Sequence, residues 1–235
     1  MDANTGLLLA LDTSSEMIGF AIAEPERLLA EATWRGQRQG TATLLASAMR
    51  ALEVSGHAGD DLRAVAVATG PGSFSGLRVG MGIAKGLAFG LGIPIVGIPT
   101  LAVTAEPFRA ARLPVCAMIA AGRSRFAYAV YEEQGGMMRE TVPLAHGVGA
   151  EIGATLAAYP AVIVCGEMDG AAETIRAVAP GAMIPPAGVR IRRPGILADM
   201  AWRRILTGAA DDLVALEPIY LHTAAHASAP RATKG

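Results

Sequence analysis

The sequence predicts an α/β protein with two lobes, each built on a mixed sheet flanked by helices. Its first half follows the order strand, strand, strand, helix, strand, helix, and its second half repeats this order in a weaker form. The chain has 235 residues, which is long for one compact domain and suits two lobes of about 100 residues each. Hydrophobic residues make up 52% of the chain and charged residues 17%, so a disordered or fibrous protein is excluded.

The three opening strands are predicted from apolar runs that are separated by polar turns. Leu7–Asp12 is almost purely apolar and ends in Asp12-Thr13-Ser14-Ser15. Met17–Ala23 and Leu28–Trp34 follow, with a turn at Pro25 between them. Runs of this length bounded by turn residues are typical of strands joined as hairpins.

Helices and single strands alternate through the rest of the first lobe. Ala42–Leu52 has its apolar residues at helical spacing, and Phe74–Phe89 is a long helix with Ser73 as its N-cap. The other predicted elements are strands at Ala64–Ala68 and Ile93–Gly97 and a helix that begins over Thr100–Arg109.

The second lobe gives fewer signals than the first. Its predicted elements are strands at Val115–Ala120, Phe126–Tyr131 and Ala161–Cys165, a helix at Ile196–Leu206 closed by Gly208, and a short extended piece at Pro218–His222. We place the two lobes at residues 1–108 and 109–222. Residues 223–235 are mostly Ala, Pro, Thr and Gly, and we expect them to form a loose tail.

The charge balance argues against a stand-alone nucleic-acid binder and the cysteine count argues against a secreted scaffold. The net charge is −1 and the isoelectric point is about 6.4, so no basic excess draws in phosphates. Two cysteines, Cys116 and Cys165, are too few for a disulfide framework. No basic segment precedes the first apolar run, and Gly-Ile-Pro occurs twice within Gly86–Ala105, which breaks that uncharged stretch as a membrane helix. We expect a cytoplasmic protein.

The helix predicted at Phe74–Phe89 carries two files of small residues at a spacing of four. One file is Gly72, Gly76, Gly80, Ala84 and Ala88, and the second is Gly82, Gly86 and Gly90. Residues four apart lie on one helix face. Each interior glycine costs about 0.5–1 kcal/mol relative to alanine, and close packing of another element would offset that cost. The files pack either against a partner chain or inside their own subunit, and both interpretations stay open.

Two polar turns are candidates for a vestigial phosphate and Mg²⁺ site. Asp12 ends the first strand beside Thr13 and Ser14, and a carboxylate with hydroxyl neighbours can hold hydrated Mg²⁺. The turn Gly70–Ser73, which includes Gly72, precedes a helix whose first amides can hold an anion. An Asx or Ser turn at Asp12 and a tight structural turn at Gly70–Ser73 are the favoured interpretations.

We expect no catalytic residue and no metal site in this chain. His222 and His226 have the spacing of metal ligands on a helix, but no carboxylate or cysteine lies near them in the sequence. The chain has neither an H-E-x-x-H motif nor a G-x-S-x-G nucleophile elbow.

Three stretches of the chain resemble the bacterial TsaB (YeaZ) family. They are LLLALDTSSEMIGFAIAE, AVAVATGPGSFSGLRVGMGIAKGLAFGLGIPIVGIPTLAV and EPIYLHT. The middle stretch is the most specific, because it joins GPGSF, S-GLR, a small-residue helix with AKGLA and a G-I-P strand. The second lobe agrees with the family only in its layout.

This resemblance implies the two-lobed actin/Hsp70/sugar-kinase-like fold with ribonuclease-H-like lobes. It implies a non-catalytic subunit that supports TsaD in the synthesis of N6-threonylcarbamoyladenosine (t6A) in tRNA. The implied partners are TsaD in a heterodimer, the ATPase TsaE at that pair, and a second copy when the chain is alone, with tRNA reached only through the complex. No cofactor is required by the chain itself, and any ATP or ADP would lie at the joint with partners.

The resemblance also assigns partner binding to two helices of the first lobe. The expected contact residues are Leu45, Met49, Phe74, Gly76, Leu77, Gly80, Met81, Ala84, Lys85 and Ala88. On this hypothesis they form an apolar surface that only a second chain covers.

The chain departs from the family at two motifs. Where many members have D-A-R-x-G-E-V-Y, Ala120 and Arg125 stand at the aspartate and glutamate positions, and Arg35–Gly40 replaces a histidine-containing R-x-H-S-E segment. An alternative function, a small Mg²⁺-dependent kinase or ATPase of the same fold, needs a second carboxylate across the cleft from Asp12, where Ala120 stands. A metallopeptidase needs a bound metal, and Thr100–Arg109 contains no histidine.

Overall fold

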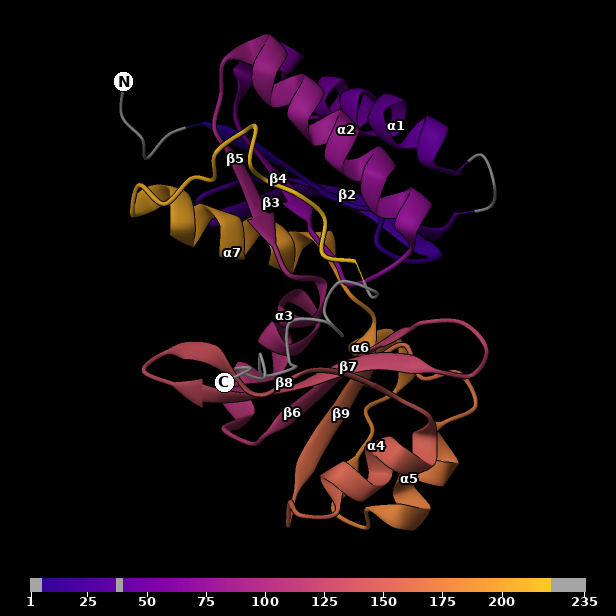
Figure 1. The fold of residues 1–235 in the computed structure, drawn as a ribbon. Helices are drawn as coiled ribbons and strands as arrows, with labels where there is room; N and C mark the ends of the chain where they lie inside the picture. Colours follow the sequence, from indigo (N-terminus) through magenta and orange to yellow (C-terminus); the bar gives the residue numbers. More distant parts are fainter. Residues whose placement is uncertain (1–5, 37–39, 221–235) are drawn as a thin grey trace, which may run out of the picture.

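A five-stranded mixed sheet forms the centre of each of the two lobes (Figure 1). The computed structural model describes residues 6–36 and 40–220. The strand order is β3-β2-β1-β4-β5 in the first sheet and β10-β9-β6-β7-β8 in the second. In each sheet the first strand of the lobe is antiparallel to the next strand in sequence and parallel to its other neighbour. The second lobe therefore repeats the topology of the first, which confirms the predicted two-lobed fold.

The first lobe contains the strands that were predicted from the apolar runs of the sequence. Its elements are β1 (Leu7–Asp12), β2 (Met17–Glu24), β3 (Arg27–Arg35), α1 (Gly40–Val54), β4 (Leu62–Ala68), α2 (Phe74–Leu91), β5 (Ile95–Ile98) and α3 (Thr100–Ala105), with 3-10 turns at Gly59–Asp61 and Glu106–Ala111. Ser73 caps α2 as predicted, since its side chain accepts a hydrogen bond from the Gly76 amide. The helix predicted through Arg109 ends as α3 at Ala105, and the 3-10 turn continues it.

The second lobe contains several elements that the sequence analysis did not predict, namely β8, α4, α5, α6 and β10. The full set is β6 (Val115–Ala120), β7 (Phe126–Gln134), β8 (Met137–Gly147), α4 (Gly149–Leu156), β9 (Val162–Gly166), α5 (Ala172–Val178), β10 (Ala182–Met183), α6 (Ala187–Arg190) and α7 (Pro194–Leu206). Residues 218–220 form no strand, and the rest of that predicted piece, with His222, His226 and the tail, lies outside the described residues.

Helix α7 packs on the first sheet, although it follows the second sheet in the sequence. Its residues Leu197, Ala198, Ala201 and Trp202 join the apolar cluster on one face of that sheet. The Trp202 indole Nε1 also donates a hydrogen bond to the Ala23 carbonyl at 3.0 Å. This packing differs from the predicted division, in which residues 109–222 form the second lobe.

Helices α1 and α2 cover the opposite face of the first sheet (Figure 1). Leu44, Ala48 and Leu52 of α1 pack there beside residues of α2. The first lobe thus has three layers, with the sheet between two helical layers. The apolar cores contain many alanines, and this accounts for much of the mean hydropathy of +0.39.

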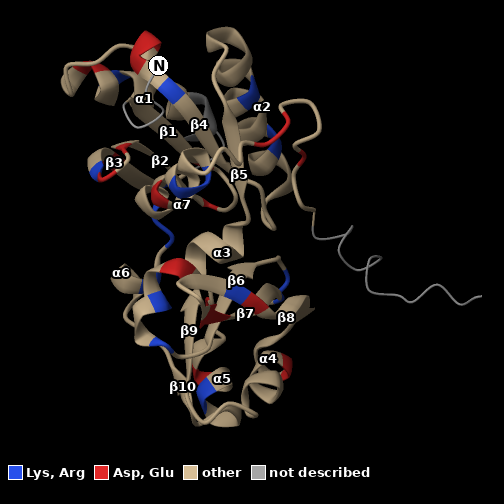
Figure 2. Cartoon of the chain, turned by 90° about the vertical axis from the view of Figure 1, so that its left-hand side faces the viewer, with Lys and Arg blue, Asp and Glu red and all other residues tan. Residues whose placement is uncertain are grey.

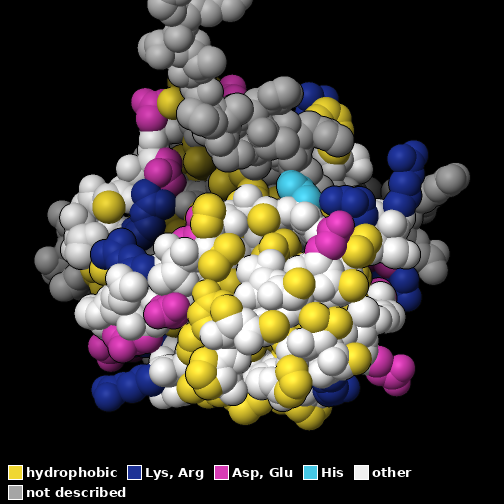
Figure 3. Space-filling model, turned by 60° about the horizontal axis from the view of Figure 1, so that its bottom comes forward, with side chains coloured by type: hydrophobic (Ala, Val, Ile, Leu, Met, Phe, Trp, Pro, Cys, Tyr) yellow, Lys and Arg dark blue, Asp and Glu magenta, His cyan; other side chains and the backbone are white. Residues whose placement is uncertain are grey.

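Helix α3 connects the two cores. Val103 belongs to the apolar cluster of the first lobe, whereas Leu101 and Ala105 pack against the second sheet. Helices α4 and α5 cover the other face of the second sheet, and hydrophobic and uncharged side chains dominate the end of the molecule shown in Figure 3. No helix within residues 6–36 and 40–220 is long and apolar enough to cross a membrane.

Both cysteines are free thiols in the second core. Burial raises the pKa of the Cys116 thiol to about 12, and it raises the pKa of Cys165 well above its usual range. The thiolate is the reactive form of cysteine, and the raised pKa values keep both side chains in the thiol form. Cys116 and Cys165 are therefore packing residues of the core, as the sequence predicted.

Candidate functional site

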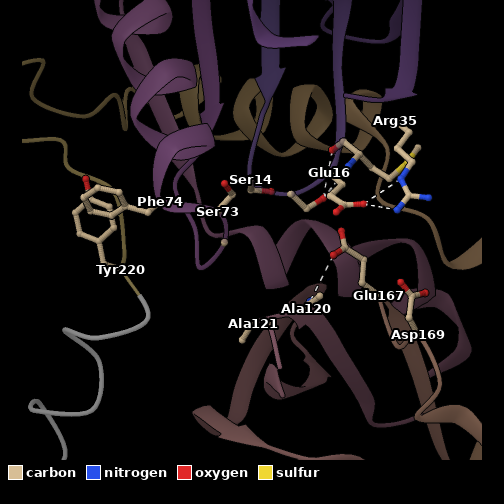
Figure 4. A pocket seen from close by; sticks show the side chains of 14 residues that line it. Ser14, Glu16, Arg35, Ser73, Phe74, Ala120, Ala121, Glu167, Asp169 and Tyr220 are labelled. Carbon is tan, nitrogen blue, oxygen red and sulfur yellow. Dashed lines mark hydrogen bonds and ion pairs between the residues drawn. The ribbon is translucent and has the colours of Figure 1, made fainter. Parts of the chain in front are cut away.

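A cleft of about 680 Å³ opens between the two lobes (Figure 4). It is lined by residues of both lobes, among them Ser14, Glu16, Arg35, Gly72, Ser73, Phe74, Ala120, Glu167, Asp169 and Tyr220. The β1–β2 turn and the start of α2 contribute the first-lobe side, and the ends of β6 and β9 contribute the second-lobe side. The cleft brings the sequence-predicted residues Ser14, Gly72 and Ser73 together.

The charges that line this cleft are mostly negative. Glu16, Glu167 and Asp169 are acidic, and Arg35 is the one basic residue among the lining side chains of the described chain. Arg35 is itself paired with Glu16 at 2.6 Å, and the hydrogen bond from this pair raises the pKa of the guanidinium. A phosphate group in the cleft would face three carboxylates, so the lining disfavours an anionic ligand.

The Asp12 carboxylate is fully engaged inside the protein. Its Oδ1 accepts hydrogen bonds from the Ser14 amide at 2.9 Å and the Ser14 hydroxyl at 2.6 Å. Its Oδ2 accepts a hydrogen bond from Arg192 Nε at 2.6 Å. The hydrogen bond from the Ser14 amide forms the Asx-type turn that the sequence favoured. Arg192 already supplies a positive charge at Asp12, where a Mg²⁺ ion would have to bind.

The turn before α2 packs directly on the β1–β2 turn. The Ser73 amide donates to the Ser14 carbonyl at 2.6 Å, and the Thr13 hydroxyl donates to the Gly76 carbonyl at 2.7 Å. A Cβ atom at Gly72 would overlap the Ser14 carbonyl oxygen. Thr13 and Ser14 are buried at this joint, and Gly72 is required for the close approach of two backbones. Their role in a phosphate site stays a prediction.

Glu167 lies beside Ala120, the position at which the kinase or ATPase alternative requires a second carboxylate. Its Oε2 lies 3.4 Å from the Ala120 amide nitrogen, and its Oε1 lies 3.6 Å from Arg192 Nη2. Neither Glu167 nor Arg192 was predicted, because each is far from Asp12 in the sequence and carries no local motif. Among the residues described, no three His, Cys, Asp or Glu side chains gather at a spacing that could hold a metal ion.

The first file of small residues on α2 faces its own subunit. Gly80, Ala84 and Ala88 of this file are buried within the chain, and so are their neighbours Leu77 and Met81. A Cβ atom at Gly80 would overlap the Thr13 hydroxyl oxygen. The prediction that these five residues contact a partner is wrong, since other residues of the same chain already cover them.

The second file faces outward. A Cβ atom at Gly82, Gly86 or Gly90 would have no neighbouring atom within 4 Å. Val79 and Phe89 lie on the same face, and their exposed fractions are 39% and 80%. We name Val79, Gly82, Gly86, Phe89 and Gly90 the α2 stripe; it contains no charged residue.

A basic edge borders the α2 stripe (Figure 2). Lys85 Nζ donates to the Val214 carbonyl at 3.1 Å, and Arg78 Nε donates to the Tyr220 hydroxyl at 3.1 Å. These contacts tie the segment after α7 along one side of α2. Phe74, which is 55% exposed, packs against the ring of Tyr220 at the same edge, with the ring centroids 4.9 Å apart.

The remaining expected contact residues stay predictions. Leu45, Met49, Gly76 and Lys85 are partly buried and Phe74 is exposed, so each of the five keeps some surface. Leu45 and Met49 belong to α1, which lies beside α2 (Figure 1).

The two glycine files should respond oppositely to alanine. Gly86→Ala should stabilise the isolated chain by about 0.5–1 kcal/mol, because alanine favours a helix and the new methyl group meets only solvent. Gly80→Ala should destabilise it by about 1–3 kcal/mol, because the methyl group overlaps Thr13. Urea unfolding of both variants measures the difference, and a stabilising Gly80→Ala would contradict the inward orientation of the first file.

Comparison with known proteins gives concordant matches. A family model described as "TsaD: tRNA N6-adenosine threonylcarbamoyltransferase" matches residues 34–157, which is just over half of the chain. The TsaB protein of Bacillus subtilis is 29% identical over 58% of this chain and 59% of its own length. The TsaB protein of Escherichia coli is 36% identical over 42% of each chain.

A solved structure agrees over a longer span. YeaZ from Pseudomonas aeruginosa superposes with a TM-score of 0.75 and 26% identity, covering 92% of this chain and all of that one. The sequence matches to the curated relatives span only about half of their length. The family model, these relatives and the shared two-lobed structure show that the chain belongs to the TsaD-related family and, within it, to the TsaB (YeaZ) proteins.

Proposed function

We propose that this chain is a supporting subunit of the machinery that makes t6A in tRNA, and that it binds a TsaD-type subunit without catalysing the reaction. The relatives' names, which describe tRNA threonylcarbamoyladenosine biosynthesis, support the pathway. The engaged Asp12 carboxylate supports the absence of catalysis, because a kinase or ATPase of this fold would have to displace Arg192 before Asp12 could hold Mg²⁺. The alternative function is therefore not favoured.

The α2 stripe is the observation that carries the proposal. Its three helical glycines together cost roughly 1.5–3 kcal/mol relative to alanine, and no atom of the described chain packs within 4 Å of a Cβ at any of them. A partner helix lying on the stripe would compensate, because a surface without side chains lets two backbones approach closely. Exposed Phe89 and Val79 would supply the buried apolar contacts that dominate such interfaces.

The stripe also indicates how the partners would be arranged. We place the TsaD-type subunit on α2 and on the neighbouring face of α1 with Leu45 and Met49, so that the first lobe, residues 1–108 with α7 added, is the partner-binding unit. Arg78 and Lys85 at the edge would meet acidic side chains of the partner. The same face would form a homodimer when the chain is alone, a TsaE-type ATPase would join the pair, and tRNA would be reached through the complex in the cytoplasm.

Co-purification tests this proposal. The chain and the TsaD protein of the same organism are expressed together, and the mass of the complex is measured by light scattering after size exclusion. A stoichiometric complex is the expected result. A folded chain that forms no complex with TsaD would overturn the proposal, and Mg-ATP binding by the isolated chain would revive the kinase alternative.

A further inference from the structure

Three arginines lie where the chain passes from the second lobe to α7: Arg190 ends α6, and Arg192 and Arg193 lie in the short connection that follows. Arg190 Nη1 donates to the Gly166 carbonyl of the second lobe at 2.6 Å. Arg193 pairs with Glu31 of the first lobe. Arg192, between them, contacts both lobes, and Figure 2 shows this connection as a basic segment between the lobes.

Arg192 has the most enclosed of these positions. Its side chain is 2% exposed. Nε donates to Asp12 Oδ2 at 2.6 Å, and Nη2 donates to the Ser15 hydroxyl at 2.9 Å on the first-lobe side. On the second-lobe side, Nη2 lies 3.6 Å from Glu167 Oε1.

The guanidinium and the two carboxylates depend on one another. A buried charge without a counter-charge is strongly unfavourable. Burial by itself would lower the pKa of Arg192, but Asp12 and Glu167 outweigh burial and hold that pKa above its usual value. Arg192 is therefore charged, and it neutralises carboxylates that belong to different lobes.

We propose that Arg192 occupies an internal cation site formed by Asp12, Ser15 and Glu167, and that this built-in cation fixes the two lobes in one arrangement without any bound ligand. In two-lobed proteins that close by a hinge around a ligand, the ligand bridges the lobes. Here a side chain of the protein makes the bridge. The inference does not use the α2 stripe, on which the proposed partner binding rests, and it shares with the proposed function only the contact between Asp12 and Arg192.

Removal of the guanidinium tests the proposal. Arg192→Ala should lower Tm by about 5–15 °C, because it leaves two carboxylates without their counter-ion. It should also speed amide hydrogen exchange on both sides of the joint, at residues 14–16 and at residues 166–169. Millimolar methylguanidinium should restore part of Tm, because it refills the vacated site, whereas methylammonium, which lacks the planar fork, should restore less.

Arg193→Ala is the matched control. It removes a neighbouring arginine whose side chain is 57% exposed and whose ion pair, with Glu31, lies within the first lobe. Its effect on exchange should stay near Glu31 and the start of α7, and methylguanidinium should not change its Tm.

A second variant covers the case in which Arg192→Ala does not fold. Glu167→Gln removes only the second-lobe half of the site, at a residue that is one-quarter exposed. It should fold and should speed exchange at residues 166–169 and 190–193. Unchanged exchange across the joint in Glu167→Gln, or an Arg192→Ala protein with unchanged Tm and exchange, would overturn the proposal.

Discussion

Gly86→Leu is expected to weaken binding of the TsaD-type partner by about tenfold to a hundredfold, while the isolated chain stays folded. The new side chain would project from the α2 stripe into the space reserved for a partner helix. Overpacking of a close interface costs about 1–3 kcal/mol. Within the chain itself the leucine meets nothing, since no atom lies within 4 Å of a Cβ at Gly86.

The dissociation constant is measured by titration calorimetry against the TsaD protein. Gly188→Leu is the matched control, because Gly188 is also exposed and also has open space at its Cβ, but it lies in α6 near the lobe joint. The control should bind normally. Normal binding by Gly86→Leu would show that the partner does not dock on the α2 stripe.

The sequence alone could not say which glycine file on α2 faces the core. Both files consist of small residues, and Leu77 and Met81 on the inner face are matched in hydrophobicity by Val79 and Phe89 on the outer face. Periodicity identifies a helix in such a case but leaves its rotation undetermined. The rotation of α2 is set in part by the hydrogen bond from the Thr13 hydroxyl to the Gly76 carbonyl. This contact joins residues that are 63 positions apart in the sequence.

Elements with a clear local sequence pattern were predicted correctly, and elements without one were missed. The ranges of β1 and β6 were correct because each is a short apolar run bounded by turns. Strand β8 was missed because most of its residues are exposed or partly buried, so polar side chains and Pro143 interrupt its pattern. Helices α4 and α5 are only eight and seven residues long, which is too short for a clear helical period.

The cleft was only partly predictable for a related reason. The hydrogen bonds between Asp12 and Ser14 are local, and the sequence favoured that turn correctly. The ion pair between Asp12 and Arg192 spans 180 residues, and nothing near either residue marks it. A carboxylate at the end of a buried strand does require a counter-charge, but the sequence does not say which of many arginines supplies it.

Trp202→Ala is expected to destabilise the whole protein by about 3–5 kcal/mol, through the first lobe. Trp202 is 2% exposed and is the largest fully buried side chain of the described residues. Its removal leaves a cavity between α7 and the first sheet and leaves the Ala23 carbonyl without the indole donor. Thermal unfolding should show a fall in Tm of roughly 6–20 °C.

The location of the damage distinguishes this result from a defect in the second lobe. Because α7 covers one face of the first sheet, hydrogen exchange should accelerate in β1 and β2 before it does in β6 and β7. Leu206→Ala is the control in the same helix, since Leu206 is 44% exposed, and it should change stability by less than about 0.5 kcal/mol. Exchange that accelerates first in the second sheet would mean that α7 supports the second lobe, and residues 1–108 would then suffice to form the first.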